Sequence, residues 1–198
     1  MPVIQFTVEK NKKQKRIMGL KDFFTRKKKE EFDLPGDLSL VKLQVGYLVD
    51  YDLKSWEVVA RNHYDWGEGD ISYEWQLKSE DEVVYLEMES DDEEKWSLSR
   101  KIPFGRLDSQ VKTHILETGD PPETIVFDGG TYYMEETSGG RFFKDGQGPG
   151  TEMLQWCYQD DKTRSFLCIE QWGENAFEAT TGKGVEEYQF TNILPREI

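Results

Sequence analysis

The 198-residue chain has few of the residues on which catalytic sites and cross-linked scaffolds commonly depend. Its two cysteines, Cys157 and Cys168, are too few for a disulfide framework. In the hairpin expected there they do not face each other directly, so we predict reduced thiols and a reducing, cytoplasmic location. Of the two histidines, His114 has no acid or nucleophile at a characteristic spacing. His63 begins an acidic loop without calcium-hand spacing, which favours a turn over a metal site.

Long hydrophobic runs and nucleotide-binding motifs are also missing. No stretch approaches the roughly 20 apolar residues of a membrane-spanning helix, and no charged-then-apolar signal peptide opens the chain. The sequence contains no Walker loop, no Rossmann glycine fingerprint, no Gly-x-Ser-x-Gly and no zinc-ligand spacing. It therefore predicts no catalytic residue, no cofactor and no metal ligand.

Charge is abundant but divided between two parts of the chain. The formal net charge is −14, yet residues 1–30 hold ten of the 25 Lys and Arg and only three of the 39 Asp and Glu. The remainder is strongly acidic and repels phosphate backbones, so we predict no nucleic-acid binding by the globular part.

Residues 1–32 form a basic segment with an apolar stripe at helical spacing. A helix here would pack on its own domain, dock on the acidic body, or contact a partner or an anionic membrane surface. For the last alternative the predicted contact residues are Ile17, Leu20, Phe23 and Phe24, followed by Arg26, Lys27, Lys28 and Lys29. Such contact would place the protein at the inner face of the membrane.

Two stretches resemble each other at a constant offset of 81 residues. Trp75 corresponds to Trp156, and the other matched pairs are Leu86 with Leu167, Glu89 with Glu170, and Trp96 with Phe177. Each stretch alternates apolar and polar residues, turns in an acidic loop and alternates again, which predicts a β-hairpin with one buried face. Turns at residues 80–81 and 161–162 place Trp75 opposite Leu86 and Trp156 opposite Leu167.

The repeat predicts a mainly β protein built from two similar tandem antiparallel units of about five strands, packed as a sandwich or as paired small barrels. We expect the first unit over residues 36–103, a connector over 104–122, and the second unit over 123–195. Leu107, Val111 and Ile115 at four-residue spacing predict a short helix in the connector, ended by Gly119 and the Pro121-Pro122 pair. The expected strands are 46–51, 56–64, 72–78, 83–89 and 95–101, then 124–128, 131–136, 152–158, 165–170 and 176–180. A Gly-rich connection is expected over residues 139–150.

Segments on these strands resemble a bacterial family known as domain of unknown function 4178. In the first half they are VGYLVDY (45–51), WEV (56–58), EWQL (74–77) and YLEME (85–89). In the second half they are GTY (130–132), FLCIEQWG (166–173), FE (177–178), Gly182 and NILP (192–195). The resemblance covers about residues 36–195. It implies no activity and carries over no site residue.

Four residues are candidates for contact with a ligand or partner. Trp66 and Trp172 occupy identical Trp-Gly-Glu loop tripeptides and would stack on a ligand or cap their own unit. Glu89 and Glu170 follow an apolar pair in each copy and would form a repeated hydrogen bond or face each other across a cleft.

The charge division and the lack of a catalytic motif favour a non-enzymatic binding or scaffold protein. Its partner would be an unknown protein, with peripheral contact to an anionic membrane through the basic segment. The alternative is a small carboxylate- or metal-dependent hydrolase with a site between the two β units.

Overall fold

The computed structural model of the chain describes residues 38–90, 94–160, 162 and 165–196. The predicted membrane contacts from Ile17 to Lys29 lie outside these residues. Within them, alternating and β-branched segments form one antiparallel sheet of eleven strands, in the order β11-β1-β2-β3-β4-β5-β10-β9-β8-β7-β6. No helix of the described part is long and apolar enough to cross a membrane.

The strands of the first half are β1 (Leu48–Tyr51), β2 (Lys54–Gly67), β3 (Asp70–Lys78), β4 (Val83–Ser90) and β5 (Glu94–Ile102). Those of the second half are β6 (Thr124–Phe127), β7 (Gly130–Phe143), β8 (Thr151–Gln159), β9 (Ser165–Gly173), β10 (Ala176–Val185) and β11 (Thr191–Leu194). The α-helix α1 spans Ser109–Thr118, and 3-10 turns lie at η1 (Leu40–Lys42), η2 (Phe104–Arg106), η3 (Lys144–Gly146) and η4 (Glu187–Gln189).

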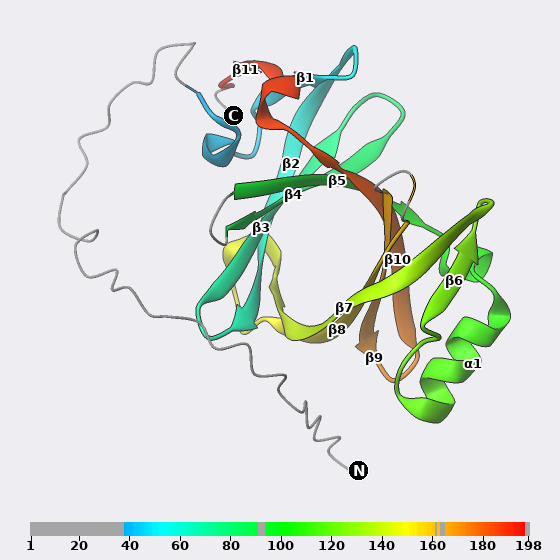
Figure 1. The fold of residues 1–198 in the computed structure, drawn as a ribbon. Coiled ribbons are helices and arrows are strands. Elements are labelled where there is room, and N and C mark those ends of the chain that lie inside the picture. Colours follow the sequence, from blue (N-terminus) through cyan, green and yellow to red (C-terminus); the bar gives the residue numbers. More distant parts are fainter. Residues whose placement is uncertain (1–37, 91–93, 161, 163–164, 197–198) are drawn as a thin grey trace.

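The sheet closes on itself because the two longest strands meet. The far ends of β2 and β7 pair through His63–Phe143, Tyr64–Phe142 and Asp65–Arg141. Strands β2-β3-β4-β5-β10-β9-β8-β7 therefore form a ring of eight, and the near ends of β2 and β7 splay outward to pair with β1 and β6 (Figure 1). The prediction of a mainly β antiparallel protein is confirmed. The strands share one sheet instead of packing as a sandwich or paired barrels, and the division into tandem units stays a prediction.

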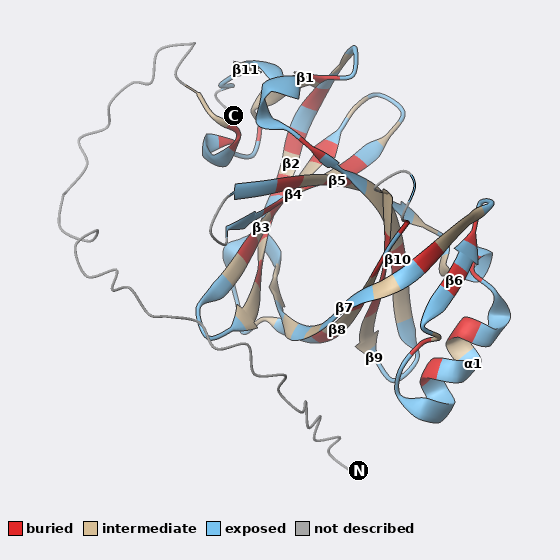
Figure 2. Ribbon diagram, in the orientation of Figure 1, coloured by how far each residue is buried: buried red, intermediate tan, exposed pale blue. Residues whose placement is uncertain are grey.

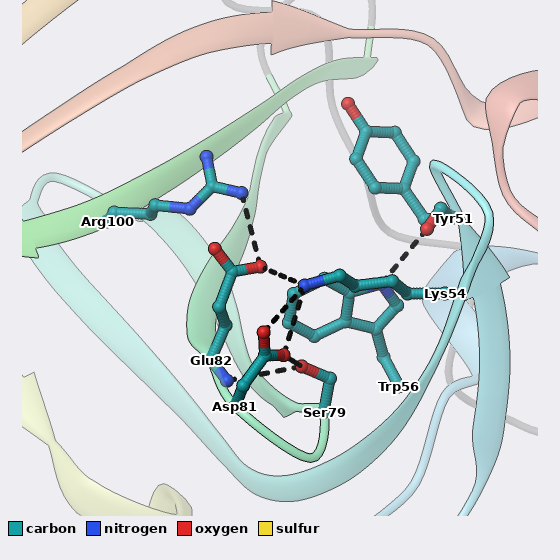
Figure 3. Close-up of polar contacts among 7 residues, drawn as sticks. All are labelled: Tyr51, Lys54, Trp56, Ser79, Asp81, Glu82 and Arg100. Carbon is teal, nitrogen blue, oxygen red and sulfur yellow. Dashed lines mark hydrogen bonds and ion pairs between the residues drawn. The ribbon is translucent and has the colours of Figure 1, made fainter.

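The first hairpin has the predicted register. Trp75 lies opposite Leu86 and Leu77 opposite Val84. The Ser79 N–H donates to the Glu82 carbonyl at 2.9 Å across the predicted turn. Figure 3 shows how this turn is tied to its neighbours: Lys54 Nζ lies 3.0 Å from Asp81 Oδ1 and 2.8 Å from Glu82 Oε2. These ion pairs are exposed, so the buried apolar pairs determine the register.

The second hairpin differs from its predicted register by two residues. Trp156 lies opposite Ile169 and not Leu167. A shift of two keeps every side chain on its predicted face, which is why the alternation alone does not distinguish the two registers. The shift also corrects the prediction of reduced cysteines: Cys157 and Cys168 lie directly opposite, with Cα atoms 4.2 Å apart, and form a disulfide. The thiol argument for a cytoplasmic location therefore does not hold.

Two apolar cores lie on the outer faces of the ring (Figure 2). The first packs η1 and the Trp56 side chain of β2 over Trp75. The second packs α1 over Trp156. The connector forms this helix, as predicted, and its Leu107, Val111 and Ile115 side chains belong to the second core. The Asp108 side chain caps the helix by accepting a hydrogen bond from the Gln110 N–H at 2.8 Å.

The first part of the predicted Gly-rich connection over residues 139–150 is strand. β7 continues through Gly139 and Gly140 to Phe143. A side chain at Gly140 would place its Cβ 2.7 Å from Trp66 Cε3 and 2.8 Å from the Asp65 carbonyl oxygen. Glycine there allows β2 and β7 to approach closely, so it serves ring closure and not chain flexibility.

Candidate functional site

The ring surrounds a cavity of about 290 Å³ that is partly open to solvent. Side chains from all eight ring strands line it. A β-bulge in each long strand makes this possible. Trp56 and Val58 of β2 belong to the first outer core, but the pairing shifts between Val58 and Ala60, so that Asn62 and Tyr64 line the cavity. An extra residue reverses the side-chain alternation, and a single strand thereby serves both the core and the cavity.

The bulge of β7 has the same effect. Tyr132 belongs to the second outer core, and the pairing shifts between Met134 and Glu136. Beyond the bulge, Phe142 lines the cavity. The two long strands thus bend from the outer cores to the cavity and meet where the ring closes.

The first half of the ring contributes a polar row of an amide and two carboxyl groups. Asn62 lies opposite Glu74, and Glu74 lies opposite Glu87. Asn62 Nδ2 donates to Glu74 Oε1 at 2.7 Å, and the Tyr64 hydroxyl lies 3.3 Å from Glu74 Oε2. The Ser72 hydroxyl donates to Glu87 Oε1 at 2.8 Å. These bonds hold the two carboxyl groups against the cavity wall.

The second half contributes a comparable row. Gln155 lies opposite Glu170, and Glu170 lies opposite Glu178. Glu178 forms an ion pair with Lys101 of β5. Glu170 is 6% exposed, and its hydrogen bond from Gln155 Nε2 is long at 3.4 Å. Of the two carboxyl groups in this row, Glu170 is the more weakly held.

Burial changes the protonation of these carboxyl groups. Loss of solvent raises the pKa of Glu87 from its usual 4.5 to about 8, and the charges of Glu74, Glu89 and Glu170 add to the rise. Burial likewise raises the pKa of Glu170 to about 7, with Glu74 and Glu178 contributing. The pKa of Glu74 is also raised by burial, although its hydrogen bonds from Asn62 and Tyr64 oppose the rise. Near neutral pH Glu87 and Glu170 are therefore in large part protonated, and a nearby charge can change their ionisation.

Aromatic rings form the wall where β2 and β7 meet. Phe142 lies 5.0 Å from Tyr64 and 5.4 Å from Trp172, measured between ring centroids. Tyr64 in turn stacks on Trp66 at 5.3 Å. Trp172 Nε1 is buried and has no hydrogen-bond partner among the described residues. A buried donor without a partner is uncommon in folded proteins, so this wall differs from a fully hydrogen-bonded core.

The four predicted contact residues differ in how they are placed relative to the cavity. Trp172 and Glu170 line it. Trp66 does not, but its Nε1 donates to the Ser72 hydroxyl, which binds Glu87. Glu89 is exposed and does not line the cavity, so Glu89 and Glu170 are not brought together as a pair.

Most polar residues of the cavity were not among the contact residues predicted from the sequence. Glu74, Glu87, Glu178 and Lys101 alternate with core residues along their strands, which is typical of a solvent-facing strand surface. The close approach at Gly182, where a Cβ would meet Phe166, also depends on how the strands pair and is not visible in the sequence. Among the described residues, no group of three or more His, Cys, Asp or Glu is placed to hold a metal ion.

Comparisons with known proteins agree with the sequence resemblance. A family model described as a domain of unknown function, DUF4178, matches residues 44–187. An uncharacterized protein of Aquifex aeolicus (strain VF5) is 23% identical over 177 residues, which cover 89% of this chain and 97% of that protein. No solved structure was found to match the chain significantly.

Proposed function

The chain belongs to the DUF4178 family, whose description states no activity, and from the geometry of the ring we propose that it is a non-enzymatic binding protein that takes a small ligand into its cavity. The observation that carries this proposal is a cavity of about 290 Å³ inside the ring, lined by polar groups and by aromatic rings. Ligand sites combine these features, and their volumes begin at roughly 300 Å³. The size suits a small molecule and not a folded partner.

The arrangement of the wall supports binding over simple packing. Buried polar groups that serve stability alone are normally fully hydrogen-bonded. Here Trp172 Nε1 lacks a partner among the described residues and Glu170 has a long bond to Gln155. A ligand that reached both groups would supply the missing interactions.

We expect a fragment library that contains cationic, neutral and anionic molecules to yield ligands that bind in this cavity. Thr180 lines the cavity, so a Thr180→Phe variant fills part of the space and is expected to weaken binding at least tenfold. Saturation-transfer NMR on the full chain measures binding, and circular dichroism verifies that the variant is folded.

Thr124→Phe is the matched control, because Thr124 is exposed on β6 and does not line the cavity. This variant should bind like the unmodified protein. Absence of any ligand from the three charge classes, or binding that Thr180→Phe leaves unchanged, would refute the proposal.

The raised pKa of Glu170 favours a second candidate, a carboxylate-dependent hydrolase with its site between the two halves of the ring. General acids work best with a pKa near the operating pH, and here a carboxyl of pKa about 7 lies under the influence of the neighbouring Glu74. Turnover of a ligand found above, lost in Glu170→Gln with binding retained, would support this candidate. Binding without turnover favours the first.

The basic segment before the described residues supports a further part of the proposal, contact with an anionic membrane surface or an unknown protein partner. Ten Lys and Arg within residues 1–30 would each add about 1 kcal/mol near an anionic leaflet. We expect the full chain to sediment with anionic vesicles and a variant beginning at Asp33 to remain in the supernatant. Equal sedimentation of the two proteins with anionic vesicles would contradict membrane contact through this segment. So would sedimentation of both proteins with neutral vesicles.

A further inference from the structure

Charge is unevenly distributed over the cavity wall. Four carboxyl groups (Glu74, Glu87, Glu170 and Glu178) and two ammonium groups (Lys101 and Lys144) line it, a formal excess of two negative charges when all are ionised. Lys101 is already paired with Glu178, and Lys144 is exposed in η3. The remaining carboxyl groups therefore lie in the wall without a cationic side chain as a direct partner among the ion pairs of the described residues.

The same cavity has an apolar side. Phe142 and Trp172 meet edge to face at one end, and Phe166 lies over Gly182 on the wall between β9 and β10. Carboxylates accept hydrogen bonds from an ammonium group, and aromatic faces attract both apolar groups and cations. Both sides of the wall thus favour one kind of molecule.

We propose that the ligand of this cavity is an organic cation, a primary amine that carries an apolar group. This inference rests on the proposed binding function and adds the chemical class of the ligand. The ammonium group lies between the row of Glu74 and Glu87 and the row of Glu170, where it gains charge-assisted hydrogen bonds. The apolar group lies against Phe142 and Trp172, where an aromatic ring also accepts a weak hydrogen bond from Trp172 Nε1 through its face. An anionic ligand of the same shape meets the excess negative charge and is rejected.

Protonation links binding to pH. An ammonium ligand favours the ionised form of the carboxyl groups, so its binding displaces protons from Glu170 and Glu87. The groups around Glu170 are Glu74 on β3, Glu87 and Tyr85 on β4, Lys101 on β5, Gln155 on β8, Glu178 on β10 and Tyr64 on β2. Glu87 faces Ser72, Glu74, Glu89 and Glu170. Most of the charged neighbours are acidic, so they favour the protonated forms of Glu170 and Glu87 until a bound cation offsets their charge.

Three probes with the same phenyl ring test the proposal: phenethylammonium, phenylethanol and phenylpropionate. By calorimetry with the full chain, we expect phenethylammonium to bind at least tenfold more tightly than phenylethanol, and phenylpropionate to bind more weakly than both. The affinity of phenethylammonium should rise as the pH increases from 6 to 8, with protons released to the buffer. The affinity of phenylethanol should not change over this range.

Two variants assign the effect to the cavity. Glu170→Gln removes a carboxylate that lines the cavity and is expected to reduce phenethylammonium binding about tenfold while phenylethanol binding is retained. Glu135→Gln, at an exposed position of β7 that does not line the cavity, should leave both affinities unchanged. Tighter binding of the neutral or anionic probe, or equal effects of the two variants, would overturn the cationic ligand while leaving a binding function intact. Failure of every probe and fragment would overturn both.

Discussion

Replacing Gly182 with valine is expected to lower the free energy of unfolding by about 3 kcal/mol, at the upper end of what overpacking costs. A Cβ at this position would lie 2.3 Å from Phe166 Cζ and 2.6 Å from the Leu98 carbonyl oxygen. Phe166 Cζ is the far end of a side chain and can move, but the Leu98 carbonyl oxygen belongs to the backbone of β5. The new side chain therefore separates β5 from β10 at one of the junctions between the two halves of the ring. Urea denaturation measures the loss.

Gly184→Val provides a matched control in the same strand. A Cβ at Gly184 would have its nearest neighbour, the Trp96 carbonyl oxygen, at 4.0 Å. Valine is also favoured in strands, so we expect this variant to change stability by less than about 0.5 kcal/mol. Equal losses for the two substitutions would show that Gly182 is not a point of close approach.

The second large effect is a fall in stability as the pH rises from 5 to 9. The pKa of Glu87 is about 8 and that of Glu170 about 7 in the folded protein, against 4.5 for an unperturbed glutamate. Below pH 4.5 these groups are protonated in both states and do not discriminate between them. Between pH 4.5 and 8 the unfolded chain ionises first, so ionisation favours unfolding. Allowing for partial solvent access, we expect a total loss on the order of 4 kcal/mol.

Removing the ionisable groups should remove this slope. The double variant Glu87→Gln and Glu170→Gln cannot ionise at these positions, and glutamine retains the acceptor for the Ser72 hydroxyl. We expect it to be more stable than the unmodified protein at pH 9 and to have a much shallower profile from pH 5 to 9, to which Glu74, whose pKa is also raised by burial, still contributes. Glu135→Gln, at an exposed position of β7, is the control and should keep the slope. A slope that survives the double substitution would mean that other groups cause it.

Local pattern was sufficient to predict most strands. The ten predicted strands are all present, and the alternation around Trp75 predicts the correct register of the first hairpin. The connector helix was predicted by the spacing of Val111 and Ile115 and by Gly119, which adopts the left-handed conformation after the last turn. These features depend on residues close together in the chain, for which period and turn chemistry suffice.

The candidate site was less accessible to sequence reasoning. Glu170 and Trp172 were among the predicted contact residues and line the cavity, but Glu89 was selected where Glu87 lies in the wall. The offset of 81 residues pointed to Glu89 because it compares positions along the chain, not positions in space. A shift of two residues in the second hairpin, with its cysteines directly opposite each other, breaks that correspondence.

By itself, the sequence determined the periodicity: which side chains share a face of each strand, and hence that Trp75 and Trp156 are buried while Glu74 and Gln155 point the other way. Only the tertiary structure decided what that second face meets. Bulges after Val58 and Met134 bend the long strands until β2 pairs with β7, so that a face with the pattern of a solvent-exposed surface becomes the wall of a cavity inside the ring. Alternation is a local property of the backbone, whereas closure requires contacts between residues about 80 positions apart.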